Sequence, residues 1–349
     1  MVRKSDAALE SKLPESVVTV AIPTLAAGRR LEECLDALRN QTRRDFEVVV
    51  VDNSGQGLVR AGGAGRQGAT VLEPDHNLGY GAAINLAFHQ SRTPFLAALN
   101  DDAAPRSQWI EALVAAAERH PEAGMFASQV RFYGEEHLDS AGMVISGDAS
   151  SKQRGHLFPA AEFDLEEEVL LPSASAALYR RTMLDEVGLF DEDFFLYCED
   201  TDLGLRAQWA GWKCIYVPGA VVDHHYSHSA GRASRLKAFY VERNRLFVAL
   251  KNFPAGMLWT VPLRTLARYW WHIRSMALGR GTAAQFRRDG NSGLRLVLIA
   301  IQAHWAFVRN ARSLWRKRRG IRSRAKLTAG EFGHLLRAHS ISARRVAEL

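Results

Sequence analysis

Two short apolar runs near the N-terminus constrain the fold more than any other feature of the chain. Residues 17–22 and 46–51 are rich in β-branched side chains, and they end at Pro23 and Asp52, which are typical of turns. Between the two runs, apolar residues recur at helical spacing: Leu31, Cys34, Leu35 and Leu38. Strand, helix and strand in this order form a crossover unit, which is nearly always right-handed and joins parallel strands.

The same alternation continues along the chain. Residues 69–72 and 95–99 have the pattern of two further strands, and residues 81–90 that of the helix between them. The pattern predicts an α/β fold with a doubly wound, mostly parallel sheet, whose ligands gather at the carboxyl ends of the strands. Three polar groups stand at such ends: Pro23-Thr24, Asp52-Asn53 and Asn100-Asp101-Asp102.

Charge divides the 349 residues into two unlike halves. Residues 1–229 contain 20 Lys and Arg against 34 Asp and Glu, a net charge of −14, whereas residues 230–349 contain 25 against 4, a net charge of +21. We expect a flexible N-terminus at 1–16, an α/β domain at 17–229 and a basic helical region at 230–349. A basic region of this kind is a solvated helical face, a surface for anionic membrane, or a surface for nucleic acid.

The cysteines and the N-terminus indicate the cellular compartment. Cys34, Cys198 and Cys214 lie far apart and form no C-x-x-C pair, which argues against a disulfide scaffold or a structural zinc site and suits a reducing cytosol. The first 16 residues have no apolar stretch of the kind that a signal peptide needs. We therefore expect a cytoplasmic protein.

Residues 188–206 combine carboxylates with aromatic rings. Glu199, Asp200 and Asp202 would lie near a helix N-terminus, where the helix dipole favours negative charge, so a charged helix start is the simplest interpretation. The rings of Phe194, Phe195 and Tyr197 favour a second one, since partly desolvated carboxylates are suited to base catalysis.

Two other polar segments each leave two interpretations open. Asn100-Asp101-Asp102 offers oxygen ligands for a hard divalent ion, or is a turn before Pro105. Residues 77–85 open a helix whose N–H groups face an anionic ligand, or form a plain helix cap. The glycines of residues 55–68 match no nucleotide-binding motif, so we predict a flexible surface loop there. Residues 131–172 are polar and irregular, as expected of an insertion or lid near an acceptor site.

Together these motifs resemble the inverting glycosyltransferases of family 2, and within them the bacterial rhamnosyltransferase-like branch. The resemblance spans about residues 17–250 and rests on six segments in order: Ala21-Ile-Pro-Thr24, Val51-Asp-Asn-Ser54, Asn77-Leu-Gly-Tyr-Gly81 with Asn85, Leu99-Asn-Asp-Asp102, residues 188–202, and His224. It implies a GT-A fold, a nucleotide-diphosphate sugar donor and a divalent metal, Mg²⁺ or Mn²⁺. Asn100 departs from the family's usual Asp-x-Asp, and an amide oxygen is the weaker ligand.

For the donor, the resemblance implies a role for each matching residue. It places Asp52 on the nucleobase, Pro23, Thr24 and Asn77 near the nucleoside, and Asp101 near the ribose. Asp102 becomes the metal ligand that bridges to the diphosphate, together with Asn100 and with His224 or the neighbouring His225.

For the acceptor, the resemblance makes Asp200 the general base that takes the proton from the attacking hydroxyl, so that one displacement inverts the anomeric centre. Glu199 and Asp202 are assigned to acceptor positioning and helix capping. The acceptor is a glycan or a lipid-linked glycan, and the transferred sugar is possibly rhamnose, as the rhamnosyltransferase-like branch implies.

Two other classes of function fit the sequence less well. A nucleotidyltransferase acting on sugar phosphates shares the sheet and the metal, but it normally has a glycine-rich basic loop after the first strand, which residues 23–28 lack. A nucleic-acid-binding protein would explain the basic half, but no recognised binding motif is present and the acidic half would repel phosphate chains. We therefore expect no nucleic-acid partner.

The basic half contains two amphipathic stretches. In residues 256–278, apolar residues that include Trp259, Trp270 and Ile273 accompany a polar stripe of Arg264, Arg268 and His272. Residues 293–308 repeat the theme, and residues 312–326 add a basic cluster. The pattern predicts helices lying in the headgroup layer, which attach the enzyme peripherally to the inner face of the cell membrane. Packing of these helices on the enzyme or in a homodimer is the alternative.

Overall fold

The computed structural model describes residues 16–63, 68–225, 234–288, 290 and 292–349. The N-terminus predicted to be flexible lies outside the described residues except for Ser16. His228 and the boundary at residue 229 also lie outside them, so the division into two domains there stays a prediction.

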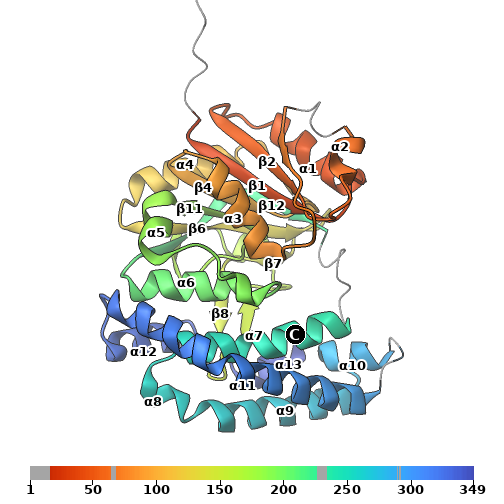
Figure 1. Cartoon of the computed structure of the whole chain (residues 1–349), viewed down its shortest axis with the longest axis vertical. Helices are drawn as coiled ribbons and strands as arrows, with labels where there is room; N and C mark the ends of the chain where they lie inside the picture. The colour runs from red at the N-terminus through yellow and green to blue at the C-terminus, as the bar shows by residue number, and fades with distance from the viewer. Residues whose placement is uncertain (1–15, 64–67, 226–233, 289, 291) are drawn as a thin grey trace, which may run out of the picture.

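A ten-stranded sheet forms the centre of the upper part of the molecule in Figure 1. Its main path runs in the order β10-β12-β6-β11-β4-β1-β2-β3, with β5 beside β12 and β7 beside β6. The strands are β1 (Val18–Thr24), β2 (Phe46–Asp52), β3 (Thr70–Leu72), β4 (Phe95–Leu99), β5 (Ala103–Pro105), β6 (Ala123–Phe132), β7 (Leu138–Ser140), β10 (Glu167–Val169), β11 (Ala176–Arg180) and β12 (Lys213–His224).

The four strands predicted from the sequence lie side by side and parallel. β1 pairs with β2 from Val18–Phe46 to Thr24–Asp52, and it pairs on its other side with β4. Strand β11 runs antiparallel between β4 and β6, while β6 and β12 are parallel to each other. The sheet is thus mixed but mostly parallel, and the predicted α/β class is confirmed.

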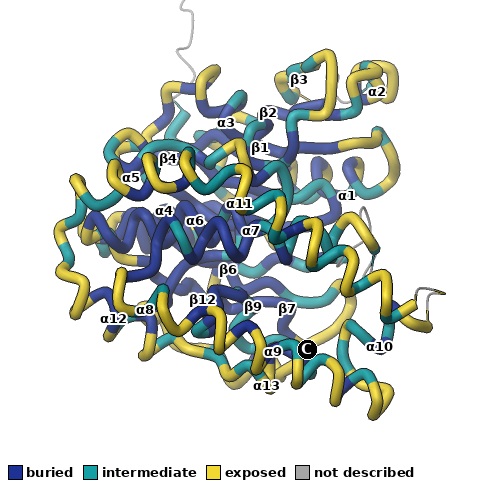
Figure 2. The backbone as a smooth tube through the Cα atoms, turned by 60° about the horizontal axis from the view of Figure 1, so that its bottom comes forward, coloured by how far each residue is buried: buried dark blue, intermediate teal, exposed yellow. Residues whose placement is uncertain are grey.

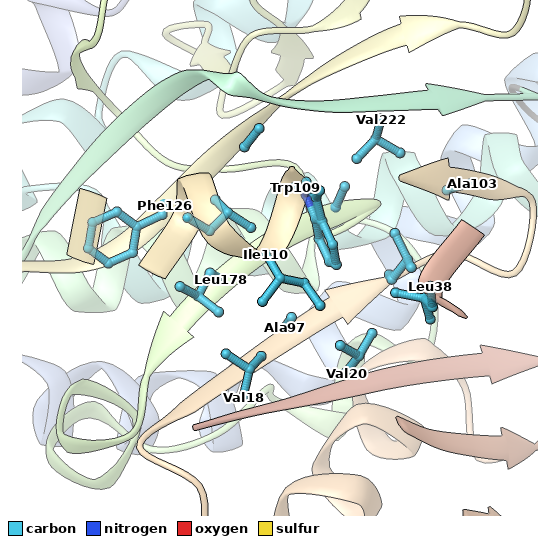
Figure 3. Packing of buried hydrophobic residues seen from close by; sticks show 14 of the residues in the cluster. Val18, Val20, Leu38, Ala97, Ala103, Trp109, Ile110, Phe126, Leu178 and Val222 are labelled. Carbon is cyan, nitrogen blue, oxygen red and sulfur yellow. The ribbon is translucent and has the colours of Figure 1, made fainter. Parts of the chain in front are cut away.

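Helices cover both faces of this sheet. α1 (Arg29–Arg39) and α4 (Trp109–Arg119) pack on one face, and α3 (Tyr80–Gln90), α5 (Arg181–Val187) and α6 (Glu199–Trp209) pack on the other. Figure 3 shows the first of these two cores, where Trp109 and Ile110 lie over Val20 and Leu178. Buried apolar packing on both faces fixes the strand ends, and with them the polar residues that follow.

The C-terminal helices form a layer below α6. They are α7 (Arg235–Asn252), α8 (Ala255–Leu258), α9 (Val261–Ala277), α10 (Gly281–Arg288), α11 (Gly293–Ser323), α12 (Ala329–Ala338) and α13 (Ala343–Glu348). A third apolar core joins this layer to α6, and it contains Trp209, Phe247 and Phe332. Trp209 and Phe332 stack with ring centroids 3.8 Å apart. The helical region therefore shares a core with the α/β part.

Two segments are more regular than the sequence indicates. Residues 131–172 contain the strand β7, the short hairpin of β8 (Met143–Ile145) and β9 (Ser151–Gln153), the 3-10 turn η2 (Ala160–Glu162) and the strand β10. The expectation of an irregular segment was wrong, because strands of three residues are too short to produce a visible alternation. The glycine-rich loop after β2 contains the short helix α2 (Leu58–Ala61).

Candidate active site

The carboxyl ends of β1 and β4 bring two of the predicted donor residues into contact. The hydroxyl oxygen of Thr24 lies 2.5 Å from Oδ2 of Asp101. Burial raises the pKa of Asp101 to about 6, with a further contribution from the charge of Asp102. Pro23 is buried beside Val51 of the neighbouring strand, so it positions the backbone at this edge.

Asp52, at the end of β2, organises the loop that follows it. Its side chain is fully buried, with Oδ1 bonded to the hydroxyl and the backbone N–H of Ser54 and Oδ2 accepting from the N–H of Val59. These bonds hold α2 against the sheet. The predicted contact of Asp52 with the nucleobase stays a prediction.

Asn77 shapes the entry to α3. Its side-chain oxygen accepts from Asn53 Nδ2 at 3.1 Å and from the N–H of Gly79 at 2.9 Å. The N–H of Tyr80 donates to the carbonyl of Phe195 at 2.8 Å. An added Cβ on Gly79 would lie 2.2 Å from that carbonyl oxygen, so the close approach requires glycine. At this N–H the helix start binds protein and not an anion.

A chain of charged contacts starts at Asp102, beyond β4. Oδ1 of Asp102 lies 3.1 Å from Nε2 of His224, and Nδ1 of His224 lies 2.8 Å from Oδ2 of Asp139. The amide nitrogen of Asn100 lies 3.2 Å from the same Nε2. Asp139, from β7, thus orients the His224 ring so that Nε2 points at Asp102, an arrangement common for histidines that bind metal.

This cluster fits a divalent cation that is completed by other ligands. Oδ1 of Asp102 is buried, and apart from its contact with Nε2 of His224 it has no hydrogen-bond partner among the described residues, so a lone pair is left open to an ion. Within the same described ranges, no group of three or more His, Cys, Asp or Glu side chains forms a complete metal site. Asp102, His224 and the amide oxygen of Asn100 are therefore a partial set, as expected where substrate oxygens supply the rest.

Electrostatics link the members of this cluster. Burial opposes ionisation of His224, but the hydrogen bonds and charges of Asp102 and Asp139 raise its pKa to about 10. Burial likewise opposes the charge of Asp102, and the contact with His224 lowers its pKa. His225 is the alternative ligand. Its Nε2 lies 2.6 Å from Nη1 of Arg30, and its ring stacks on Tyr133. This geometry favours His224 over His225.

On the opposite side of the site, α6 begins with the two carboxylates that the sequence predicts for acceptor chemistry. Asp200 is partly exposed, and its oxygens accept from the N–H groups of Ala174 at 3.3 Å and Thr201 at 2.6 Å. Glu199 is buried, and its Oε2 makes no hydrogen bond among the described residues. Burial and the charge of Asp200 raise the pKa of Glu199 to about 8, and burial also raises the pKa of Asp200.

The turn before α6 has a strained backbone. Phe195, Tyr197 and Cys198 all have positive φ angles, of 62°, 68° and 65°, which non-glycine residues rarely adopt. Asn244, on α7, holds this turn by donating to the carbonyls of Phe194, Leu196 and Tyr197 at 2.7 to 2.9 Å. Strain that a buried amide maintains is a common feature of active sites, and here it fixes the start of the helix that carries Asp200.

Asp202 does not lie with the other two carboxylates. It is fully buried, and it contacts Arg206 at 2.9 Å, Lys251 at 2.7 Å and the amide of Asn252 at 2.9 Å. The geometry corrects the expectation of a capping or acceptor-positioning role, because these contacts join α6 to α7 and leave no open oxygen toward the acceptor.

Two functional residues were missed in the sequence. Asp139 and Asn244 each hold a predicted site residue or turn in place, yet neither stands in a recognisable motif. The only signal for Asn244 in the sequence was an asparagine inside an otherwise regular helical pattern. The structure shows that this asparagine is buried. Nothing in the run around Asp139 distinguishes it from a surface carboxylate.

Comparison with known proteins decides the family. The model described as Glycosyl transferase family 2 matches residues 19–188, and that of Glycosyl transferase family group 2 matches residues 162–314. An N-acetylglucosaminyl-diphospho-decaprenol L-rhamnosyltransferase of Mycobacterium tuberculosis is 32% identical over 298 residues, covering 78% of this chain and 96% of the relative. The chain belongs to glycosyltransferase family 2. A shorter match, 42% identical over 90 residues, covers 23% of this chain and 33% of rhamnosyltransferase WbbL of Escherichia coli.

Solved structures agree on the fold of this family 2 glycosyltransferase. GalNAc-T7 with UDP, GalNAc and Mn²⁺ has a TM-score of 0.57 at 14% identity, covering 79% of this chain and 54% of its own, so the chain spans about half of that protein. A mannosyltransferase of Pyrobaculum calidifontis with GDP-Man and Mn²⁺ has a TM-score of 0.52 at 19% identity, covering 89% of this chain and 86% of its own. The predicted GT-A fold and the rhamnosyltransferase-like branch are confirmed, and the nucleotidyltransferase alternative is set aside.

Proposed function

We propose that this glycosyltransferase transfers rhamnose, with inversion, from a nucleotide-diphosphate donor to a hydroxyl of a lipid-linked glycan. The observation that carries the proposal is that a partly exposed carboxylate, Asp200, and the Asp102 of the Asp102–His224 pair both lie near enough to Tyr80 for their charges to act on its hydroxyl. The kind of sugar and acceptor is taken from the M. tuberculosis relative, whose name specifies a rhamnosyl group and a diphospho-decaprenol acceptor.

The chain's own residues account for the displacement. Asp200 takes the proton of the acceptor hydroxyl while that oxygen forms a bond to the anomeric carbon, and the bond to the diphosphate oxygen breaks with its electron pair. The raised pKa of Asp200 suits it to accept a proton near neutral pH. A single in-line displacement inverts the anomeric configuration.

The negative charge of the departing diphosphate would be offset by a metal ion held at the Asp102–His224 pair. Asp102, His224 and Asn100 would hold a Mg²⁺ or Mn²⁺ ion, which offsets the negative charge that develops on a leaving diphosphate. Thr24, Asp101 and the loop around Asp52 bind and orient the nucleoside.

A panel of nucleotide sugars with Mg²⁺, Mn²⁺ or EDTA tests this function. We expect release of nucleoside diphosphate from a rhamnose donor only with metal and a lipid-diphosphate-linked acceptor, and a product of inverted configuration by NMR. Asp102→Ala should weaken metal-dependent donor binding more than Asn100→Ala, because a carboxylate binds a hard cation better than an amide does. Retained configuration, or metal-independent transfer at the full rate, would count against the proposal.

Attachment to an anionic membrane completes the proposed function, and it rests on the inverted amphipathicity of α9. The predicted polar stripe is only partly outside: Arg264 is exposed, but Arg268 is buried against Asp148 and Glu242, at 2.6 Å and 2.7 Å, so its expected place at the headgroups is wrong. The opposite, apolar face is exposed, with Leu263 70% and Trp270 62% accessible. A helix in water normally has the reverse arrangement.

Helix α11 extends this apolar surface. Its exposed face contains Leu294, Val297, Leu298, Ile301, Trp305 and Val308. Both helices lie at the end of the molecule away from β1 to β3, and exposed segments of both face the viewer in Figure 2. Exposed arginines accompany them: Arg264, Arg274, Arg295, Arg309 and Arg312. No helix among the described residues is both long and apolar enough to span a bilayer.

Interfacial tryptophans with arginines suit the headgroup layer of an anionic bilayer, which on the cytoplasmic side would meet a lipid-linked acceptor. The full chain should pellet with anionic vesicles at low salt, and a Trp270→Glu/Ile301→Glu double variant should not. Leu165→Glu, at an exposed site on the α/β part, is the matched control. A full chain that stays in the supernatant would refute membrane binding, and a dimer that the double variant dissociates would assign the face to self-association.

A further inference from the structure

A group of cations lies between α6 and α9, on the side of the hairpin β8–β9 that faces the C-terminal helices. Ser151 of β9 accepts a hydrogen bond from the hydroxyl of Thr201 at 2.8 Å, which places this strand beside the residue that follows Asp200. The next residue, Lys152, is close enough to Lys237 of α7 and Arg268 of α9 for their charges to affect it. The cluster thus starts at the acceptor side of the proposed base.

Lys152 has no ion-pair partner among the described residues. The nearby carboxylates of Asp148 and Glu242 are already shared by Arg245 and Arg268. Burial and the charges of Lys237 and Arg268 together lower the pKa of Lys152 to about 8. A partly buried lysine with cations beside it, and with no ion pair of its own among the described residues, is unfavourable unless a ligand supplies the negative charge.

His272, one turn beyond Arg268 on α9, adds an unused hydrogen-bonding atom. Its Nδ1 is buried and makes no hydrogen bond in the part of the chain that the structure describes. Burial and the charges of Arg268 and Lys152 lower its pKa to about 3, so the ring is neutral and can donate one N–H. This N–H can donate to a phosphate oxygen, and the charge of the neighbouring lysine favours an anionic acceptor of that bond.

Lys237 connects this cluster to the acceptor side of the site. Its ammonium group lies 5.6 Å from the centre of the Tyr197 ring, in the strained turn before Glu199 and Asp200. α9, which carries His272 and Arg268, presents its opposite face outward as the apolar surface described above. The cations therefore lie between the proposed base and the proposed membrane face.

We propose that Lys152, Lys237 and His272 bind a phosphate group of the acceptor, at the diphosphate that joins its sugar to the lipid. This site rests on the proposed function for the identity of the acceptor, and it deepens that function by assigning residues to acceptor recognition. A diphosphate between sugar and lipid requires cationic side chains between the base and the bilayer, and these residues occupy that place.

Steady-state kinetics of Lys152→Gln test the site. With an N-acetylglucosaminyl-diphospho-polyprenol acceptor we expect the acceptor KM to rise at least about ten-fold, since a charge-assisted hydrogen bond is lost, with an unchanged donor KM. With an uncharged alkyl N-acetylglucosaminide the variant and the parent should agree. Lys152→Arg should restore most of the affinity, and Lys213→Gln, which breaks only the ion pair with Glu168 on β10, is the matched control.

Three results would overturn the assignment. An unchanged acceptor KM in Lys152→Gln, with transfer intact, refutes the site and leaves the proposed function standing. Equal losses with the charged and uncharged acceptors would indicate a structural role. Weaker pelleting of Lys152→Gln with phosphatidylglycerol vesicles that contain no acceptor would assign the cluster to membrane headgroups.

If neither acceptor is used, the proposed function fails, and calorimetry with inorganic pyrophosphate in metal-free buffer decides the site alone. Binding that Lys152→Gln loses and Lys213→Gln retains supports a phosphate site. Binding that both variants retain, or none in the parent protein, refutes it.

Discussion

The segment from Asp191 to Asp202 contains two pairs of acidic side chains in opposite surroundings. Asp191 and Asp202 share Lys251, at 2.5 Å and 2.7 Å, and despite burial the charge of Lys251 lowers the pKa of both. Glu199 and Asp200 form no ion pair with Lys or Arg among the described residues, and burial raises the pKa of both. One pair joins two helices, and the other has no counter-charge that would hold it ionised.

The contrast shows that burial alone does not identify a candidate catalytic carboxylate. Both pairs are largely removed from water, but a lysine fixes the first pair in its ionised form. The second pair is left without a counter-charge, which costs stability and creates basicity. Four variants test this division, in order of decreasing expected effect.

Asp200→Asn should cause the largest change. The amide keeps the shape but cannot accept the proton, so turnover should fall by about 10² to 10⁴-fold while donor affinity stays within about two-fold. Single-turnover assays and calorimetric titration of the donor measure the two quantities. Turnover near that of the parent protein would remove Asp200 from the base role.

Lys251→Met should lower the free energy of unfolding. It leaves Asp191 and Asp202 buried without the cation they share, and breaking a buried pair costs about 3–5 kcal/mol of the free energy of unfolding. We expect the lower end, because Arg206 still contacts Asp202. Urea unfolding measures the loss, with Lys326→Met, at an exposed lysine, as the control. A loss equal to that of the control would contradict the role of Lys251.

Glu199→Gln should change the pH dependence. The charge of Asp200 raises the pKa of Glu199, so Asp200 ionises first and Glu199 is still neutral on the acidic limb of kcat/KM, which should stay in place. The change should appear in the pH dependence of stability. The folded-state pKa of Glu199, about 8, exceeds its ordinary value of 4.5, so its contribution to stability is present at low pH and is lost as the pH rises toward 8.

The variant should therefore gain stability relative to the parent protein between about pH 5 and pH 8. Denaturation midpoints at several pH values measure this gain. A stability difference that does not change with pH would show that Glu199 does not titrate as its burial and the charge of Asp200 imply.

Asp193→Asn should have the smallest effect. Oδ2 of Asp193 lies 2.6 Å from Nζ of Lys317. The side chains of Asp193 and Lys317 are 42% and 34% exposed, so the ion pair contributes less than about 1 kcal/mol to stability. Urea unfolding and turnover should both match the parent protein within error. A loss as large as that of Lys251→Met would show that the exposed and buried ends of this network act as a unit.

Much of the fold follows from the sequence because the parallel strands are continuous apolar runs. The strands predicted at residues 17–22, 46–51, 69–72 and 95–99 differ from β1 to β4 by at most two residues at an end. Thr24, Asp101 and Asp102 meet where the parallel arrangement requires. The three-residue strands after β6 could not be predicted, because register with a distant strand, and not a local pattern, defines them.

Residues of the candidate site could be predicted only where they belong to a motif that is recognisable in the sequence. Asp139 and Asn244 act through partners 85 and 47 to 50 residues away, and no local spacing indicates such pairs. The stripe containing Arg268 was predicted to face outward. Arg268 instead pairs with Asp148, in the turn of the hairpin β8–β9, and with Glu242 on α7, and the spacing of residues within α9 indicates neither partner. Helical spacing identifies two faces but not which of them is buried.

The bonds from Asn244 to the turn before α6 have a consequence for protein engineering. The position of Asp200, the proposed base, depends on an amide that lies 44 positions downstream, inside the part of the chain that would be exchanged in a chimera. A tail grafted from another glycosyltransferase would have to reproduce this amide, and the lysine that contacts Asp202, before the base could take its position. If the proposed roles of Lys237 and Asp200 hold, acceptor recognition and the geometry of the base are inherited together, through one helix.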